Sequence, residues 1–199
     1  TGNVKTHSPV KILFNEPIQP DSKFFSFEPE VKIVMVLVDN TLFIQPQPRF
    51  ENSTTYTLTI KKGLRDKFNH PLRKDFVFQF STEPPARVVE VSPTGENLPL
   101  NLQLKIIFDR EIDKASVEKS FRIEPETEGI LEWLNESSLI WKPKALSYAT
   151  DYQISVSGQS LQGDPIEPYQ WSFKTEAQPK PQILPSLIPE APSPSPSVV

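Results

Sequence analysis

The chain has 199 residues, of which 37% are hydrophobic and 23% charged, with a formal net charge of −4. This length holds one large or two small domains, and the charge gives no basic surface for nucleic acid or an anionic membrane. Cysteine is absent, which excludes disulfides, thiolate nucleophiles and cysteine metal sites. The 22 prolines, against only 6 glycines, indicate turns and edge strands in a chain rich in β-structure.

The N-terminal residues TGNVKTHSPV lack the apolar centre of a signal peptide. The longest apolar run, IVMVLV at residues 33–38, is far shorter than the ~20 residues of a membrane-spanning helix and fits a buried strand. We therefore expect no membrane span in this chain.

Further along the chain, apolar residues alternate with a period of two. Segment 76–80 places three phenylalanines on one face, segment 102–108 places four apolar residues on one face, and segment 169–173 places three aromatic residues on one face. Burying each such side chain gains roughly 1.5–3 kcal/mol, so these one-sided strands need an apolar partner sheet. No segment keeps a helical apolar period over three turns, and the sequence predicts an all-β fold.

Landmarks of the first half recur in the same order 93 to 97 residues later. ILFNEPIQPDS at 12–22 answers IIFDREIDKAS at 106–116, and the matched pairs include Phe14 with Phe108, Tyr56 with Tyr152, and Phe80 with Phe173. Solenoid units are only about 20–50 residues long, whereas this period has the size of an independent domain. The sequence therefore predicts a tandem duplication.

Each copy offers about seven short strands separated by turn signals, which is typical of a β-sandwich. We expect one sandwich over residues 1–83 and another over 86–176, joined by a short, stiff hinge at Pro84–Pro85. The strand-like segment ARVVEVSPTG at 86–95 has no full counterpart ahead of the first copy, so residues 1–83 are expected to lack their first strand. The proline-rich residues 177–199 are expected to form a disordered linker or tail.

Tyr56 and Tyr152 fit a tyrosine corner, in which the tyrosine hydroxyl bonds to nearby backbone at the start of the penultimate strand. Phe50 and Leu146 precede them by six residues in matching positions. The alternative is that both tyrosines are ordinary half-buried strand residues.

The segments VVEVSPTGENLPLNLQLKIIFDREID, SSLIWKPKALSYATDYQISV and YQWSFKTE carry a resemblance to the bacterial immunoglobulin-like (Ig-like) domain of S-layer and other envelope proteins. The resemblance covers residues 1–176 nearly twice and implies two Ig-like β-sandwiches. The turn before the last strand departs from the family pattern in both copies, with Phe68 where glycine is usual and with Ser160 and Asp164 where aspartate and asparagine are usual. These departures leave the predicted fold intact but weaken any common chemical role for the turn.

No catalytic, cofactor-binding or metal-ligating residue is predicted. His7 and His70 are the only histidines, too few for a zinc site or a Ser-His-Asp triad, and His70 is read as an exposed turn residue. Asp109, Glu111 and Asp113 alternate as in a calcium loop, but the required glycine and later glutamate are missing, and a solvated acidic loop is favoured. We expect Glu111→Ala or Asp113→Ala to leave stability nearly unchanged, with or without calcium.

Two further groups have a functional and a structural interpretation. Two carboxylates can serve as the acid and base of a glycosidase, and such groups flank Pro29 and Pro125: Glu28, Glu30, Glu124 and Glu126. In each copy, however, they are expected two residues apart on one short strand and pointing the same way, so protection of an edge strand by charge and proline explains them better. Among the tryptophans, Trp141 and Trp171 fit core strands, whereas Trp133 is the one to test as a platform for sugar rings.

The resemblance implies a non-catalytic structural or adhesive spacer module of a larger bacterial cell-envelope or secreted protein. Its partners would be adjacent domains of the same polypeptide and a cell-wall or surface glycan or protein, with no nucleic acid. Two alternatives stay open: a fragment of a bacterial macroglobulin-like protease trap, and a carbohydrate-binding accessory domain of an envelope enzyme.

Overall fold

The computed structural model describes residues 3–181, and the predicted tail lies outside the described residues from position 182 onward. The first half contains β1 (Val10–Leu13), the 3-10 turn η1 (Ser22–Phe24), β2 (Phe25–Glu28), β3 (Lys32–Val38), β4 (Thr41–Gln47), β5 (Thr55–Ile60) and β6 (Phe76–Ser81). The second half contains β7 (Val88–Ser92), β8 (Gly95–Leu98), β9 (Leu104–Phe108), α1 (Lys114–Ser120), β10 (Arg122–Glu124), β11 (Gly129–Asn135), β12 (Ser138–Pro143), β13 (Asp151–Val156) and β14 (Tyr169–Thr175). Within residues 3–181, no helix has the length and apolar character needed to cross a membrane.

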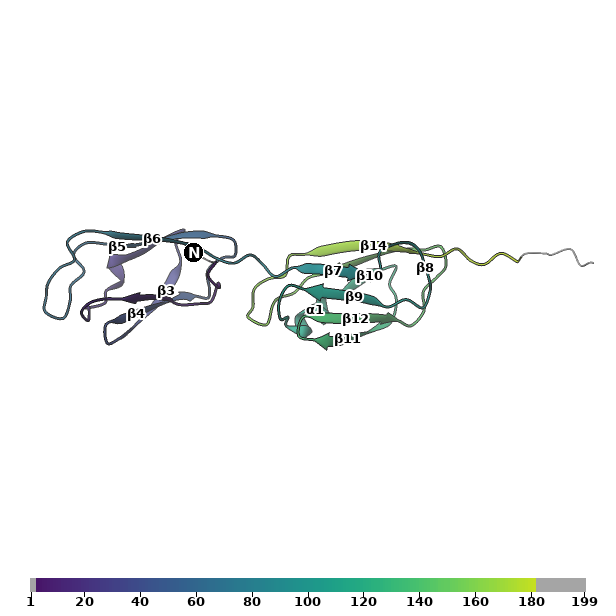
Figure 1. Cartoon of the computed structure of the whole chain (residues 1–199), viewed down its shortest axis with the longest axis horizontal. Coiled ribbons are helices and arrows are strands. Elements are labelled where there is room, and N and C mark those ends of the chain that lie inside the picture. The colour runs from purple at the N-terminus through teal and green to yellow at the C-terminus, as the bar shows by residue number, and fades with distance from the viewer. Residues whose placement is uncertain (1–2, 182–199) are drawn as a thin grey trace, which may run out of the picture.

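Each half is a β-sandwich of two sheets, and the two sandwiches follow each other along the long axis (Figure 1). The sheets of the first domain have the strand orders β1-β4-β3 and β2-β5-β6. Those of the second domain have the orders β11-β12-β9-β7 and β10-β13-β14-β8. All strand pairs are antiparallel except β14 with β8. The prediction of a mainly β fold is confirmed.

The period of two explains the core of the second domain. Leu104, Ile106 and Phe108 alternate along β9 and are all buried. From the opposite sheet, the rings of Tyr152 and Phe173 stack with their centroids 5.2 Å apart. Strand β9 begins two residues later than the predicted segment, which started at 102. The apolar faces of the two sheets thus cover each other as the alternation predicts.

Helix α1 was not predicted from the sequence. Its seven residues make only two turns, too few for a helical period to stand out over three turns. Val117 is its buried residue, and the carboxylate of Asp113 caps its N-terminus by accepting a hydrogen bond from the backbone of Ser116.

Both predicted tyrosine corners are present. The hydroxyl of Tyr56 accepts a hydrogen bond from the Glu51 backbone N–H at 3.0 Å, and that of Tyr152 accepts one from Ser147 at 2.9 Å. Both tyrosines are buried, with exposed fractions of 2% and 3%, so the alternative of ordinary half-buried residues is wrong. The preceding Phe50 is also buried and packs on Tyr56 with a centroid distance of 4.7 Å.

One part of the predicted core differs in the first domain. Phe76 and Phe78 on β6 are 39% and 49% exposed, although the alternation predicted that they face a partner sheet. Phe80, further along the same face, is half-buried. For Phe78, the difference arises because the sheet opposite β6 ends at β1, with no further strand to cover the ring among the described residues, whereas its counterpart Trp171 is half-buried. For Phe76 this does not hold, because its counterpart Tyr169, also predicted to face inward, is 37% exposed although β7 is present.

Tyr152→Phe should lower the free energy of unfolding of the second domain by about 1–2 kcal/mol, because the ring stays while the Ser147 N–H loses its partner. Urea denaturation followed by tryptophan fluorescence measures this domain, since all three tryptophans lie in it. Tyr169→Phe is the matched control, because Tyr169 is an exposed tyrosine of the same domain. Equal effects of the two substitutions would contradict the corner's contribution.

Candidate functional site

The two sandwiches meet at a junction built around the carboxylate of Asp164, whose side chain is fully buried. Thr6 Oγ1 of the first domain donates a hydrogen bond to Asp164 Oδ1 at 2.5 Å, and Asn52 Nδ2 donates to the same oxygen at 3.3 Å. The guanidinium of Arg49 lies 3.8 Å from this oxygen and also donates to the carbonyl of Gly163. A buried carboxylate of the second domain is therefore held mainly by donors of the first.

Arg110 of the second domain brings further charge to the junction. Its Nη1 lies 3.7 Å from Glu83 Oε2 and 4.0 Å from Asp164 Oδ2, while its Nε donates to Asp109 at 3.1 Å. Partial burial of the guanidinium opposes its charge, but the hydrogen bond and charge of Asp109, with the charges of Glu83 and Asp164, raise the pKa of Arg110. The guanidinium therefore stays charged and offsets the acidic groups around it.

The connection at Pro84–Pro85 is fixed on both sides by backbone hydrogen bonds. Glu83 N–H donates to the Val4 carbonyl of the first domain at 2.9 Å. Ala86 N–H donates to the Pro165 carbonyl of the second domain at 2.9 Å. Since the two prolines between these anchors have restricted φ angles, the connection has little freedom to bend.

Asp164 lies in a short turn, residues 160–166, that extends to the junction. The first domain has the equivalent turn at residues 66–72, but a different side chain holds it. In the second domain, Ser160 Oγ accepts from the Asp164 N–H at 3.1 Å. In the first, Asp66 Oδ1 accepts from the N–H groups of Phe68 at 2.9 Å and His70 at 2.8 Å. Although burial raises the pKa of the Asp66 carboxyl, its hydrogen bonds from His70 and Phe68 and the charge of His70 outweigh this and lower the pKa.

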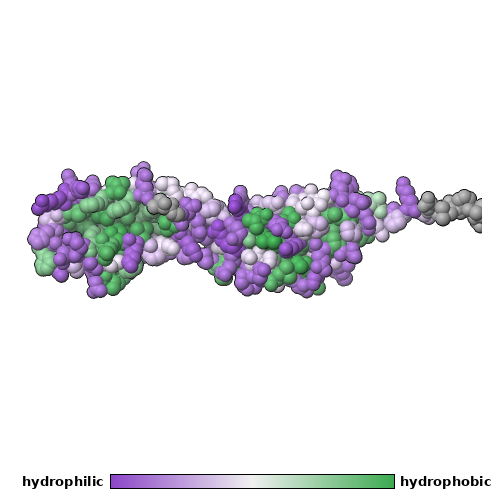
Figure 2. Space-filling view, in the orientation of Figure 1, coloured by the Kyte–Doolittle hydropathy of each residue, from purple (hydrophilic) through white to green (hydrophobic). Residues whose placement is uncertain are grey.

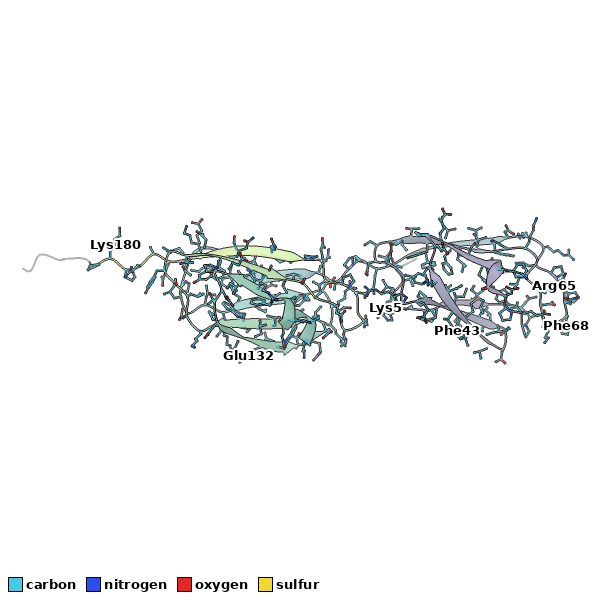
Figure 3. All side chains as sticks on the ribbon, turned by 180° about the vertical axis from the view of Figure 1, so that it is seen from behind. Lys5, Phe43, Arg65, Phe68, Glu132 and Lys180 are labelled. Atoms are coloured by element: carbon cyan, nitrogen blue, oxygen red, sulfur yellow. The ribbon has the colours of Figure 1, made fainter. Side chains whose placement is uncertain are left out.

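The place of the turn decides its role. In the first domain the turn lies at the outer tip, where Figure 3 labels Arg65 and Phe68, and His70 is 77% exposed as predicted. In the second domain the equivalent turn points at the first domain, near Lys5 in the same figure. Sequence reasoning noted Asp164 only as a departure from the family pattern. The signal it missed is that an acidic residue replaces the histidine of the other copy.

The carboxylates considered as an acid-base pair lie at edge strands, as expected. β2 and β10 are edge strands of their sheets, and Glu28 and Glu124 are their last residues. Glu30 and Glu126 lie beyond the strand ends rather than on the same strand as their partners, which corrects the predicted placement.

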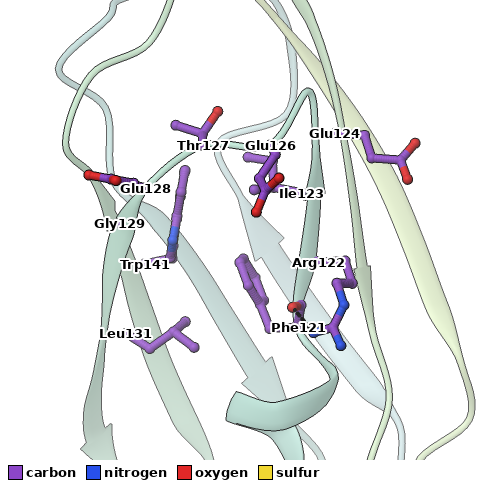
Figure 4. A pocket seen from close by; sticks show the side chains of 10 residues that line it. All are labelled: Phe121, Arg122, Ile123, Glu124, Glu126, Thr127, Glu128, Gly129, Leu131 and Trp141. Carbon is purple, nitrogen blue, oxygen red and sulfur yellow. Dashed lines mark hydrogen bonds between the residues drawn. The ribbon is translucent and has the colours of Figure 1, made fainter.

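Glu124, Glu126 and Glu128 line a cleft of about 670 Å³ on the second domain. In Figure 4 the rings of Phe121 and Trp141 lie between the strands that frame it, while Glu124 and Glu128 point to opposite sides. Its lining includes neither histidine nor cysteine, so its ionisable groups are the three glutamates and Arg122. The cleft therefore has glutamate side chains at its edge and the aromatic rings of Phe121 and Trp141 at its base.

The tryptophans have structural contacts. Trp141 is buried, and Gly129 makes room for its indole, because a Cβ atom at position 129 would lie 2.4 Å from the indole nitrogen. Trp133 stacks on Phe108 with a centroid distance of 6.4 Å, and its Nε1 donates to Glu118 at 2.8 Å. The tryptophan proposed for sugar binding therefore has its ring and its nitrogen engaged within the domain.

The acidic residues at alternate positions after β9 have separate roles. Asp109 pairs with Arg110, Glu111 is exposed, and Asp113 caps α1 while also accepting from Gln159 Nε2 at 2.9 Å. Across the described residues, no group of three or more histidine, cysteine, aspartate or glutamate side chains is arranged to hold a metal ion. The expectation that Asp113→Ala leaves stability unchanged is revised, since it overlooked the helix cap.

Comparison with known proteins gives the following similarities. The family model described as "Bacterial Ig-like domain" matches residues 1–82 and again 83–175. Among solved structures, L,D-transpeptidase 3 from Mycobacterium tuberculosis is 22% identical over 45% of this chain and 37% of its own, with a TM-score of 0.34. The N-terminal part of the bacterial S-layer protein SbsC is 19% identical over 46% of this chain and 24% of its own, with a TM-score of 0.34. The I9–I11 tandem from titin is 8% identical over 88% of this chain and 62% of its own, with a TM-score of 0.36.

The chain spans less than half the length of the first two of these proteins. Among curated proteins, none matches the chain.

Asp113→Ala should lower the free energy of unfolding of the second domain by about 1 kcal/mol, because α1 loses its N-cap. Glu111→Ala is the matched control, since its exposed carboxylate two residues away makes no cap, and we expect almost no change. Urea denaturation with and without calcium measures both variants. A rise in stability on adding calcium to the wild type that either substitution removes would instead indicate a metal site.

Asp164→Ala should lower the free energy of unfolding by about 1–3 kcal/mol, because the buried Thr6 hydroxyl loses its acceptor and two guanidinium groups lose a counter-charge. It should also make the two domains unfold in separate transitions. Tryptophan fluorescence reports on the second domain and circular dichroism on both domains, so the two signals should no longer give the same unfolding curve. Asp151→Ala is the control, because Asp151 pairs with Lys174 on the exposed surface of one domain. If Asp164→Ala and Asp151→Ala had the same effect on stability and on the unfolding of the two domains, the junction would not couple the domains.

Proposed function

We propose, since the chain belongs to the bacterial Ig-like domain family over both of its halves, that it is a non-catalytic spacer module of a larger bacterial cell-envelope or secreted protein. It would hold the parts of that protein, or a partner on the cell surface, at a set distance. The observation that carries this proposal is the buried polar junction around Asp164, which ties the second sandwich to the first.

The physical argument concerns freedom of motion between domains. Domains joined only by a flexible linker reorient freely, so the distance between their outer ends varies widely. Here, both sides of the proline connection are hydrogen-bonded into a domain, and donors of the first domain bind Oδ1 of the buried Asp164 carboxylate of the second. Its Oδ2 has no hydrogen-bond partner among the described residues and lies 4.0 Å from Arg110 Nη1. Because a buried carboxylate needs compensating donors and charges, a packed arrangement of the two domains that moved Thr6 and Asn52 away from Asp164 without admitting water would cost free energy. A unit with such a junction keeps the distance between the outer ends of its two domains fixed.

The chemistry of the surface is consistent with a mechanical role. The cleft on the second domain is lined by three glutamates without a histidine or cysteine, and Trp133 is engaged with Glu118 and Phe108. These contacts favour a scaffold over an enzyme or a sugar-binding domain. Location on the cell surface or outside the cell is part of the proposal, and only family membership supports it.

The proposal predicts one narrow distribution of distances between the two domains. The chain has no native cysteine, so Lys32→Cys and Gln170→Cys, both on exposed strand positions, accept a single pair of spin labels. Pulsed electron paramagnetic resonance should give one narrow distribution of distances between the two labels in the otherwise unchanged protein. The same pair combined with Asp164→Ala should give a broader distribution, because the junction loses its central acceptor.

A broad distribution already present without Asp164→Ala would contradict the spacer proposal. A glycan array probed with the same protein gives the second readout. Specific binding of a glycan that Trp133→Ala abolishes, with the fold retained by circular dichroism, would favour the carbohydrate-binding alternative instead.

A further inference from the structure

Strand β3 is an edge strand of the first domain, with β4 as its only neighbour among the described residues. Its counterpart in the second domain, β11, is also the outermost strand of its sheet. The second domain has β7 at the opposite edge and still ends at β11 on this side. The open edge at β3 is therefore a property of the fold that both domains share.

The two edge strands differ in the features that prevent pairing with another chain. The outward face of β11 has Glu132 at its centre, which pairs with Lys142, and the register of β11 shifts near its end. β3 pairs with β4 over seven residues without a shift, and only valines follow Lys32 on its outward face. Val36, the counterpart of Glu132, is 53% exposed. Charges, prolines and bulges on edge strands normally prevent edge-to-edge association, and residues 33–38 have none of them.

The backbone of β3 has free hydrogen-bonding groups along this edge. Next to β4, the Asn40 carbonyl accepts from the Phe14 N–H at 2.9 Å, so even-numbered residues here bond toward β1 and odd-numbered residues of β4 toward β3. Because hydrogen-bonded pairs alternate along an antiparallel ladder, the odd-numbered residues of β3 point their N–H and C=O groups away from β4. These residues are Ile33, Met35 and Leu37, and no described residue outside the sheet bonds to their backbone groups.

We propose that β3 is the interface of a homodimer, in which it pairs antiparallel with β3 of a second copy of this chain around a two-fold axis at Met35. In this register, the edge groups of Ile33 meet those of Leu37 in the second copy, and those of Met35 meet their own equivalents. Each free N–H and C=O group on one edge then has a partner on the other. The edge of β3 is therefore complementary to itself.

The side chains match in the same register. On the outward face, Val34 of each copy lies opposite Val36 of the other, and these side chains, now 49% and 53% exposed, lose contact with water. Lys32 lies opposite Val38 and beside Asp39 of the second copy, so opposite charges meet at each end of the paired strands. This match of backbone, valines and charges favours a second copy over an unrelated extended segment.

The shape of the molecule is compatible with this dimer. Most strands of both sandwiches run along the long axis, so antiparallel pairing would direct the second domains of the two copies to opposite ends (Figure 1). Figure 2 shows hydrophobic residues along the lower outline of the first domain, the side on which Figure 3 labels Phe43 of β4. Phe43 is the β4 partner of Val36. The apolar outward face therefore continues from β3 onto the neighbouring strand.

Sedimentation of the whole chain at micromolar to millimolar concentration tests the dimer, and a reversible monomer–dimer equilibrium is expected. Val36→Glu should weaken the dimer at least tenfold, because it places a carboxylate opposite Val34 of the second copy and gives β3 the charge that β11 has. Leu134→Glu is the matched control and should leave the equilibrium unchanged, since Leu134 is also 53% exposed but lies on β11. Circular dichroism checks that both variants stay folded.

Single cysteines test the register, because the chain has no native cysteine. Met35→Cys should form an intermolecular disulfide on mild oxidation, since the Cα atoms of a directly opposed pair lie about 5.5 Å apart. Leu37→Cys, two residues along the same face, should not, because the Cα atoms of position 37 in the two copies would lie about 13 Å apart. The proposal is overturned by a chain that stays monomeric at millimolar concentration, by a dimer that Leu134→Glu weakens as much as Val36→Glu, or by equal cross-linking of the two cysteine variants.

Discussion

A sheet that is apolar on one face only must keep that face from water, and this constraint decides most of the molecule. In the second domain it is met at the centre of the sandwich, since Ile106 and Phe108 from one sheet and Tyr152 and Phe173 from the other are all buried. In the first domain, the same pattern of residues leaves Phe78 half exposed. One strand makes the difference, because β7 supplies Val88 to the core of the second domain and no equivalent strand covers β1 among residues 3–181.

The junction follows a different rule, because its central group is polar. Burying a carboxylate costs free energy unless hydrogen bonds and opposite charges compensate. Thr6, Asn52 and Arg49 compensate Asp164 from the first domain, while Arg110 does so from its own domain. Apolar surfaces can slide over each other, whereas a carboxylate with fixed donors accepts one arrangement. A polar junction therefore defines orientation as well as contact.

The sequence predicted those features that depend on periodicity and repetition. Alternation placed Leu104, Ile106 and Phe108 on one face, and the matched spacing of Tyr56 and Tyr152 predicted both tyrosine corners, which are confirmed. It did not predict α1, which is too short to show a helical period.

Asp164 could not be assigned in this way either, since its partners Thr6 and Asn52 lie more than a hundred residues away in another domain. Only the packing of one sandwich on the other brings them together. The duplication nevertheless contains a usable comparison, because a change of residue type at matching positions can mark a change of surroundings. His70 is exposed at the outer tip and Asp164 is buried at the junction, although both occupy the same turn. Ile12 and Ile106 show the converse case: their side chains are identical but differ in burial, because among the described residues only β9, which carries Ile106, has a neighbouring strand on its outer side.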